Sequence, residues 1–388
     1  MSLHVLVIPS AYPRREEPNS GVFYKEQTEG LRRAGVQVAV VHSELRSLRN
    51  AVRPAIAFAN HWQVSETIEN GVPVVRRHAW AMPHARLRMQ LWVADTVGLV
   101  ERYAARCGWP DVIHAHGALF AGIAAKHLWT AKRIPFVLTE HSTAFGRGLI
   151  RAWQERIIRE VMHEASGLVA VGKALARLLE PYAAGKRIEV IPNFIDTNFF
   201  APPKEPRREN EGQFRVLSIG YLTPKKGMDV LIEAFAAAFS DDRSALLDIA
   251  GDGPERCRLE MLARARGVEE QVRFLGSLSR SEVRDTMWRA NAFALASRVE
   301  TFGVVLIEAL ATGLPVVATM AGGPEDIVDE RVGSLVRVGD VGAFAGALRV
   351  MRRQWHQYDV ATLRNHVLER FSEGVVAQRV IDVLERAA

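Results

Sequence analysis

The chain has 388 residues, of which 48% are hydrophobic, and this length favours two globular domains because a single core seldom grows so large. The net charge of +6 is uneven, since residues 1–200 carry 25 Lys and Arg against 17 Asp and Glu, whereas residues 201–388 carry 25 against 27. A basic half suits nucleic acid, an anionic membrane surface or a phosphorylated substrate. No nucleic-acid motif is present, so we expect no nucleic-acid partner and weigh a membrane surface or lipid phosphate against a plain solvated surface.

The first predicted element is the strand H-V-L-V-I-P. No charged region precedes it, and it runs into Tyr and Pro too soon for a signal peptide. No stretch approaches about 18 uncharged apolar residues, so no transmembrane helix is expected. Cys107 and Cys257 lie in different halves of the chain and suggest neither a disulfide framework nor a zinc site. These features fit a reducing, cytoplasmic location.

Short apolar runs then alternate with helical patterns, which is typical of parallel α/β architecture. The strands predicted in the first half are H-V-L-V-I-P, V-Q-V-A-V-V, D-V-I-H-A-H, F-V-L-T-E-H, G-L-V-A-V and I-E-V-I-P-N. Helices fill the gaps, and G-V-F-Y-K-E-Q-T-E-G-L-R-R-A-G is expected to end on Gly35 in a left-handed cap.

The second half restarts the same alternation. Its predicted strands are R-V-L-S-I-G, A-L-L-D-I-A-G, V-R-F-L-G, A-F-A-L-A, P-V-V-A-T and S-L-V-R-V, and the helix L-I-E-A-L-A-T-G is expected to stop at Gly313. Residues 201–213 are Pro-rich, charged and without periodicity, so they are interpreted as a surface linker between domains 1–200 and 201–370.

Two acids in the run E-T-F-G-V-V-L-I-E give the strongest functional signal. Glu300 falls on a predicted loop and Glu308 on the second turn of the following helix. At about 1.5 Å per residue the carboxylates would lie roughly 12 Å apart along the helix axis, about the reach from a sugar hydroxyl to a ribose. The N–H groups of Phe302, Gly303 and Val304 would form a helix N-terminus, which attracts a diphosphate. The run therefore indicates a sugar-nucleotide enzyme.

The text around these acids, A-S-R-V-E-T-F-G-V-V-L-I-E-A-L-A-T-G-L-P-V-V-A-T-M-A-G-G-P-E-D-I-V, resembles the E-x7-E block of retaining GT-B glycosyltransferases, family 4 in particular. The resemblance covers nearly all of the chain. It implies an α/β fold of two Rossmann-like doubly wound domains facing a cleft, with an acceptor-side domain at 1–200 and a nucleotide-sugar domain at 201–370. It also implies that the last helix, within 371–388, crosses back to the first domain.

Within this resemblance, Glu308 would bind the ribose hydroxyls and Glu300 the donor-sugar hydroxyls. Lys226, in S-I-G-Y-L-T-P-K-K-G-M-D, would neutralise the leaving phosphate. The family usually has Gly-Arg and then Lys-Gly in this loop. Gly220 and Lys226 match, but Tyr221 stands where the Arg is expected, which leaves Lys225 or the Tyr221 hydroxyl to compensate for one missing cation.

A second loop of the same domain, A-G-D-G-P-E, resembles the family's G-x-G-P loop. Gly251 and Gly253 would let the backbone approach the nucleotide, although a plain tight turn explains them almost as well. Leu278 and its neighbours in F-L-G-S-L-S are candidates for the base site.

The first domain offers candidates for the transfer step and the acceptor side. His141 lies in T-E-H, similar to a family element beside the donor sugar and phosphate, whereas a capping histidine is the alternative. Gly21 resembles the family's acceptor-side glycine, and Arg14 and His116 are further acceptor-side candidates. His114 and His116 share a strand face, but no Cys or paired acid completes a metal set and no D-x-D occurs, so no metal is expected.

The segment from His61 to Trp92 is rich in Trp and Arg. It is interpreted as an acceptor-binding or membrane-facing surface, or as core tryptophans with exposed arginines. No G-x-G-x-x-G follows a strand and no G-x-x-x-x-G-K-[ST] occurs, so no nicotinamide, flavin or P-loop nucleotide is indicated and no cofactor is expected.

The combined prediction is a retaining, metal-independent glycosyltransferase of polysaccharide or lipopolysaccharide biosynthesis. It would move a sugar from a nucleotide diphosphate sugar, with UDP or GDP as the nucleotide, to a hydroxyl of a glycan, lipid-linked or small-molecule acceptor. The alternatives are a GT-B sugar-nucleotide epimerase, a disaccharide phosphorylase, and a non-catalytic GT-B binding subunit. The last of these remains an alternative because Tyr221 stands where the family has an arginine.

Overall fold

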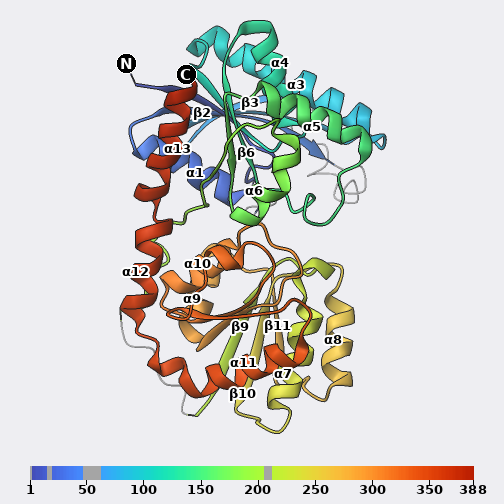
Figure 1. Ribbon diagram of the computed structural model, residues 1–388, viewed down its shortest axis with the longest axis vertical. Coiled ribbons are helices and arrows are strands. Elements are labelled where there is room, and N and C mark those ends of the chain that lie inside the picture. The colour runs from blue at the N-terminus through green and yellow to red at the C-terminus, as the bar shows by residue number, and fades with distance from the viewer. Residues whose placement is uncertain (1, 15–19, 47–62, 205–211) are drawn as a thin grey trace. The chain divides into compact units, whose positions relative to one another are not determined.

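The computed structural model describes residues 2–14, 20–46, 63–204 and 212–388. They form two compact α/β units (Figure 1). The first comprises Met1–Val171, Leu175–Asn193 and Glu373–Ala388, and the second comprises Gly172–Ala174 and Phe194–Ser372. Both are Rossmann-like with parallel sheets, which confirms the predicted fold class. Of the predicted linker at 201–213, residues 205–211 lie outside the described residues.

The first unit is built on an eight-stranded sheet of order β3-β4-β2-β1-β5-β6-β7-β8. Its strands are β1 His4–Ile8, β2 Gln37–Arg46, β3 Val64–Glu69, β4 Val72–Trp80, β5 Val112–His116, β6 Phe136–Glu140, β7 Gly167–Ala170 and β8 Ile188–Val190. All neighbours run parallel except β3 and β4. Helices cover both faces, so the central strand β1 is buried at every position and reads as a continuous apolar run.

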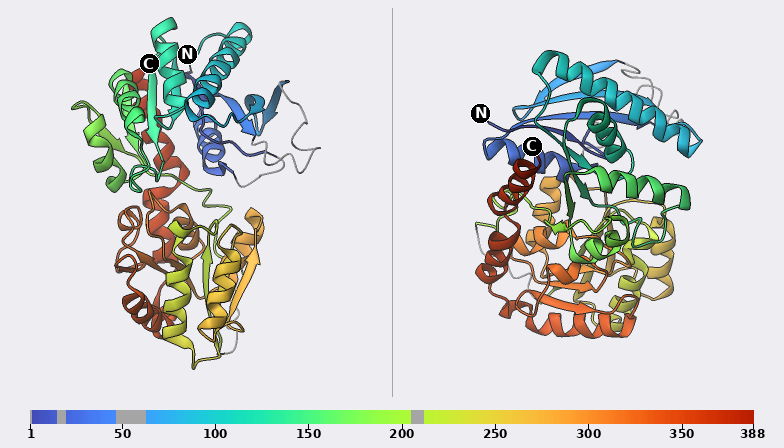
Figure 2. Two further views of the ribbon diagram at one scale, coloured as in Figure 1. Left: turned by 90° about the vertical axis from the view of Figure 1, so that its right-hand side faces the viewer. Right: turned by 45° about the horizontal axis from the view of Figure 1, so that its top comes forward.

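The helices of the first unit are α1 Val22–Arg33, α3 Ala85–Cys107, α4 Ala121–Lys132, α5 Ala152–Glu164, α6 Lys173–Leu179 and α13 Glu373–Ala387, with the short 3-10 turn η2 Glu180–Tyr182. Helix α1 ends as predicted, because Gly35 follows it with φ of +92°. Helix α13 belongs to this unit although the residues before it belong to the second. It packs beside α1 and against β6 (Figures 1 and 2).

An antiparallel hairpin of β3 and β4 extends one edge of this sheet, and the sequence analysis did not identify it. Asn70 and Gly71 form its two-residue turn, with φ of +49° and +82°. This Asn-Gly turn between strands is the usual signal of a hairpin. Within the segment from His61 to Trp92, Trp92 is buried, whereas Trp62 lies outside the described residues.

The second unit is built on a six-stranded parallel sheet of order β11-β10-β9-β12-β13-β14. Its strands are β9 Phe214–Ile219, β10 Ala245–Ala250, β11 Val272–Gly276, β12 Ala292–Leu295, β13 Val316–Thr319 and β14 Gly333–Val336. Its α-helices are α7 Met228–Phe239, α8 Arg256–Ala265, α9 Arg280–Arg289, α10 Val304–Ala311, α11 Val341–Gln354 and α12 Val360–Phe371. Short 3-10 turns occur at η3 Pro224–Lys226, η4 Pro324–Asp326 and η5 Trp355–Gln357.

The core of the second unit lies where α7 and α11 cover the sheet, with Phe214, Phe235 and Phe344 fully buried between them. Helix α10 ends before Gly313, which has φ of +80° as its predicted stop requires. Across the described residues of both units, no helix combines the length and apolarity that crossing a membrane demands.

Candidate active site

An ion pair joins Lys226 and Glu300 at the carboxyl edge of the second sheet. Lys226 ends η3, which follows β9, and Glu300 follows β12. Lys226 Nζ donates to Glu300 Oε2 at 2.7 Å, and the two side chains are 16% and 12% exposed. Strands β9 and β12 are neighbours, and successive strands lead away from them in opposite directions. Open α/β sheets bind ligands at such a switch point, so the pair occupies the place where a ligand is expected.

The loop that carries Glu300 is fixed by its backbone. Glu300 N donates to Ala321 O, and Gly323 N donates to Glu300 O, both at 2.9 Å. The next residues lead into α10, whose N-cap is Gly303. Among the described residues, the N–H groups of residues 302–304 have no hydrogen-bond acceptor. They form the anion-attracting helix N-terminus that the sequence suggests.

Phe302 and Val304 contribute to this site through their backbones. The Phe302 side chain is 2% exposed and packs edge-on against Phe371, with ring centroids 5.7 Å apart. It therefore anchors the loop to the core, and its N–H group is one of those without an acceptor among the described residues. Val304 is the first residue of α10 and supplies the same kind of donor.

Glu308 lies on the second turn of α10 and is 8% exposed. Arg280 Nη1 is 3.9 Å from Glu308 Oε1, which is too far for a hydrogen bond. Burial raises the pKa of Glu308 from its ordinary 4.5 to about 7, and the charge of Arg280 opposes this shift. A buried carboxyl without a hydrogen-bond donor at bonding distance is suited to accept bonds from ligand hydroxyls.

Arg280 is a site residue that the sequence reasoning missed, although Leu278 beside it was named as a base-site candidate. Its guanidinium lies over the rings of Phe199 and Phe200, 5.3 and 4.7 Å from their centroids. These contacts hold the cation near Glu308. No local motif signals this role, because Arg280 simply begins α9.

The loop after β9 carries Gly220, Tyr221 and Lys225. Tyr221 is 64% exposed, and Lys225 O accepts a hydrogen bond from Arg298 N at 2.7 Å. Gly220 N donates to Ala250 O at 3.0 Å, which joins this loop to the end of β10.

Gly251 and Gly253 pack against that same loop. A Cβ on Gly251 would lie 2.0 Å from Gly220 O, and one on Gly253 would lie 2.5 Å from Leu222 O. Both positions also have positive φ, of +124° and +157°. The glycines are therefore needed for backbone packing between the two loops, which accounts for them without a nucleotide.

Three histidines meet at the ends of β5 and β6 in the first unit. His116 and His141 join through Nδ1 and Nε2 at 3.0 Å, and His114 Nε2 pairs with Thr139 Oγ1 at 2.8 Å. Burial lowers the pKa of His114 and His141 to about 3 and also lowers that of His116. All three imidazoles are neutral near pH 7. Tyr24 of α1 packs edge-on against His116 and His141.

The two remaining acceptor-side candidates lie around the loop after β1. Gly21 has φ of +72°, and a Cβ there would lie 2.5 Å from Ala11 O, so only glycine permits this approach of α1 to the loop. Arg14 pairs with Glu44 at the end of β2. The Glu44 carboxylate therefore offsets the charge of Arg14.

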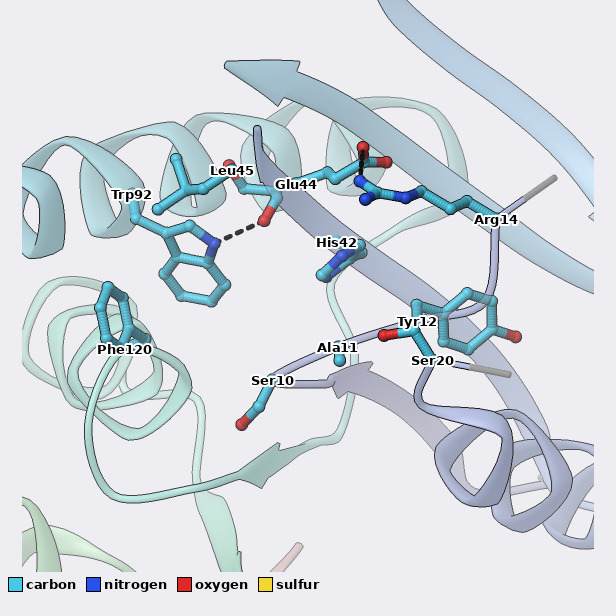
Figure 3. Close-up of a pocket in the computed structure, with 11 residues that line it drawn as sticks. Ser10, Ala11, Tyr12, Arg14, Ser20, His42, Glu44, Leu45, Trp92 and Phe120 are labelled. Atoms are coloured by element: carbon cyan, nitrogen blue, oxygen red, sulfur yellow. Dashed lines mark hydrogen bonds and ion pairs between the residues drawn. The ribbon is translucent and has the colours of Figure 1, made fainter. Parts of the chain in front are cut away.

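A cavity of about 250 Å³ opens beside this ion pair (Figure 3). Ser10, Ala11 and Tyr12 after β1 line it, together with His42–Leu45 of β2. Trp92 of α3 and Phe120, which precedes α4, line its other side. Phe120 has φ of +62° and ψ of −85°, a backbone strain worth about 1–3 kcal/mol that tends to occur at functional sites.

Family models match both halves of the chain. Residues 202–358 match the model described as glycosyl transferases group 1. Residues 20–199 match the model described as glycosyltransferase family 4. The two matches together cover most of both α/β units.

Individual proteins resemble the chain over almost its whole length. A putative teichuronic acid biosynthesis glycosyltransferase, TuaC of Bacillus subtilis, is 26% identical over 89% of this chain and 88% of its own. Sucrose-phosphate synthase of Thermosynechococcus elongatus has a similar structure, with a TM-score of 0.79 and 20% identity over 99% and 98% of the two chains. HepE of Anabaena, in complex with UDP and glucose, gives a TM-score of 0.75 and 20% identity over 98% and 99%.

Proposed function

The chain belongs to the group 1 and family 4 glycosyltransferases, and on that premise we propose that it transfers a sugar from a nucleotide diphosphate sugar to an acceptor hydroxyl with retention of anomeric configuration. The observation that carries the proposal is the Lys226–Glu300 pair at the switch point of the second sheet, beside the N-terminus of α10. The HepE complex with UDP and glucose supports a nucleotide-sugar donor.

In this proposal each group has a separate role. The buried Glu308 carboxylate accepts hydrogen bonds from the ribose hydroxyls, and Glu300 accepts them from the donor sugar. Lys226 and the N–H groups of residues 302–304 face the diphosphate and stabilise its growing negative charge. The proposed reaction uses no metal ion, because these groups supply the positive charge. His141 is assigned to the transfer step by the resemblance of T-E-H, and its neutral imidazole is suited to accept a hydrogen bond.

The proposed transfer proceeds without a covalent enzyme intermediate. The acceptor oxygen forms a bond to the anomeric carbon on the face from which the phosphate departs. The bond from that carbon to the β-phosphate oxygen breaks, and its electron pair leaves with the nucleoside diphosphate. The hydroxyl proton passes to the departing phosphate oxygen, so the products are a glycoside and a nucleoside diphosphate.

Slow transfer to water tests this reaction before the acceptor is known. We expect proton NMR of the protein with UDP-glucose, GDP-mannose or ADP-glucose to show α-glucose or α-mannose as the first product, together with the free nucleotide. The rate should be unchanged in EDTA. A β-anomer appearing first contradicts retention, and loss of turnover in EDTA contradicts the metal-free mechanism.

The same assay separates the competing reactions. A disaccharide phosphorylase would need inorganic phosphate and no nucleotide. An epimerase would yield a second nucleotide sugar without an acceptor. A non-catalytic subunit would bind a nucleotide without releasing sugar.

We also propose that the first unit contacts an anionic membrane surface through the amino-terminal turns of α3 and the loop before α5. Leu87, Leu91 and Leu149 are 40%, 48% and 52% exposed there. Arg86 lies over the ring of Trp153, 5.1 Å from its centroid, which joins the two segments, and Arg147 adds an exposed cation. Exposed leucines among cations suit an anionic bilayer.

Sedimentation with vesicles tests this surface. We expect binding to phosphatidylglycerol vesicles and not to phosphatidylcholine vesicles, weakened by salt and by the double change Leu87→Ser and Leu91→Ser. Met261→Ser, which changes an exposed residue of the second unit, is the control. Equal binding to both lipids, or none to either, contradicts the proposal.

A further inference from the structure

Two loops of the second unit approach each other closely at the Lys226–Glu300 pair. The loop between β9 and α7 carries Lys226, and the loop between β12 and α10 carries Glu300. Gly227, at the end of the first loop, has φ of +61°, and a Cβ there would lie 1.9 Å from Ala296 O of the second loop. Any other residue would collide with that carbonyl. The backbone beside Lys226 is therefore packed directly against the second loop.

Arg298 of the second loop holds the first loop at three points. Its backbone N–H group donates to Lys225 O at 2.7 Å, and its Nη1 donates to Pro224 O at 2.5 Å. Both carbonyls belong to η3, which ends at Lys226. The guanidinium also bonds both carboxylate oxygens of Asp229, in the first turn of α7, at 2.9 and 2.8 Å. One residue thus fixes the backbone on either side of Lys226.

Asp229 fixes the orientation of this guanidinium. Its side chain is 22% exposed, and Arg258 of α8 approaches the same carboxylate at 3.5 Å. Burial opposes ionisation of Asp229, but the hydrogen bonds and charge of Arg298 outweigh it and hold the pKa of Asp229 below its ordinary value. A bidentate pair of this kind is specific in geometry as well as strong. Because the carboxylate offsets its charge, Arg298 supplies geometry to the loop rather than net positive charge.

We propose that Arg298 is a positioning residue for sugar transfer, which sets the place of Lys226 Nζ beside Glu300 by holding the loop between β9 and α7, without itself touching the donor. The inference rests on the proposed function, because it concerns the cation assigned to the leaving diphosphate. A displacement of about 1 Å in a group that acts on the transition state can lower the rate about 100-fold. The contacts of Arg298 therefore matter for turnover although they lie outside the reacting groups.

Hydrolysis of UDP-glucose, GDP-mannose and ADP-glucose by the full chain tests this role. We expect Arg298→Met to lower kcat about 10- to 100-fold. The affinity for UDP, GDP or ADP should change by less than about threefold, since Lys226 contributes more to the transition state than to the bound donor. A fall in affinity at full kcat overturns the proposal.

Arg352→Met is the matched control. Arg352 also bonds an aspartate and a loop carbonyl, Asp242 and Gly212 O, but both precede strands and lie at the amino end of the same sheet. Its loss removes the same kind of contacts far from Lys226, so kcat should be unchanged. An equal loss of kcat in Arg352→Met and Arg298→Met would show a general effect on the unit and overturn the assignment.

Coupling to Lys226 separates positioning from other roles. In a Lys226→Met background, Arg298→Met should change kcat by less than about twofold, because no cation is left to position. The same fold loss in both backgrounds overturns the proposal. Asp229→Asn should lower kcat about tenfold, because it loosens the guanidinium while leaving its charge, and it serves if Arg298→Met does not fold. An unchanged or higher kcat in Asp229→Asn would mean that the charge of Arg298 acts directly.

Acetylation of lysines by N-hydroxysulfosuccinimide acetate, followed by mass spectrometry, needs no activity. The Lys226 side chain is 16% exposed, so release of its loop in Arg298→Met should speed its acetylation at least about threefold. Lys126, which pairs with Glu160 in the first unit, is the internal control and should react equally in both proteins. An unchanged rate at Lys226 overturns the proposal.

Failure of this inference is distinguishable from failure of the proposed function. If Lys226→Met lowers kcat and Arg298→Met does not, the positioning role is wrong and the proposed function stands. If none of the three donors is hydrolysed, the proposed function is contradicted, and the acetylation rates still decide whether Arg298 holds Lys226 in place.

Discussion

Replacing Lys226 with methionine is expected to lower kcat for sugar transfer by about 100- to 1,000-fold, the usual effect of losing one group that stabilises charge in the transition state. The diphosphate gains negative charge as the glycosidic bond breaks, so the cation contributes more to the transition state than to the bound donor. Donor affinity should therefore fall much less than kcat. Steady-state kinetics with a fixed acceptor measure both quantities.

A structural effect of the same change has to be separated from this one. Lys226→Met leaves Glu300, which is 12% exposed at its side chain, without its cation, and a buried charge that loses its partner is destabilising. The double change Lys226→Met with Glu300→Gln removes the unpaired charge, so stability should recover while turnover does not. Arg243→Met, which breaks an exposed ion pair of the same unit, should leave turnover unchanged. Weaker acceptor binding at full kcat would remove Lys226 from the phosphate site.

Replacing Glu308 with glutamine is expected to weaken nucleotide binding by about 10- to 100-fold, because hydrogen bonds from ribose to a charged group are worth about 1.5–3 kcal/mol. The loss should depend on pH. The pKa of Glu308 is about 7, so parent affinity should rise as the pH increases through that value and the carboxylate forms. The diphosphate titrates alike in both proteins, and the difference between their pH profiles isolates Glu308. Calorimetric titration across this range measures it.

The same substitution should affect the stability of the protein without ligand in the opposite direction. A carboxyl whose pKa rises from 4.5 to about 7 on folding stabilises the folded state below pH 4.5, and that contribution is lost as the pH increases to about 7. The loss is about 3 kcal/mol. The stability of Glu308→Gln relative to the parent should therefore increase by about this amount between pH 4.5 and about 8. Glu270→Gln, at an exposed carboxyl, should show no such change. A pH-independent difference would contradict the raised pKa.

Most of the confirmed predictions of strands and helix ends came from sequence patterns within single elements. Short apolar runs located twelve strands. The most continuous of these runs, such as β1, are strands that are covered on both faces and therefore show no polar alternation. Gly313 located the end of α10, because a left-handed residue must follow it. The Asn-Gly pair at 70–71 is also a local signal, so the hairpin of β3 and β4 could have been predicted by the same reasoning.

Such local patterns could not predict contacts between segments that are distant in the sequence. Lys226 and Glu300 meet because β9 and β12 are neighbours in the sheet. The order of strands in a sheet cannot be predicted from the residues of either segment. Arg280 approaches Glu308 through stacking on two phenylalanines that precede β9. The cavity of the first unit is lined by residues that follow β1, by residues of β2 and α3, and by Phe120, which precedes α4. The residue type of Phe120 does not predict its positive φ.

Thermal unfolding with UDP, GDP, ADP and their sugars, in the parent and in Glu308→Ala, tests whether a nucleotide sugar binds at Glu308. A nucleotide at about 100 times its Kd should stabilise the parent by roughly 2.7 kcal/mol, with one base preferred and the shift lost in the variant. That result would identify the donor and place it at Glu308. Stabilisation by no nucleotide, or equal stabilisation of both proteins, would contradict the proposed donor site.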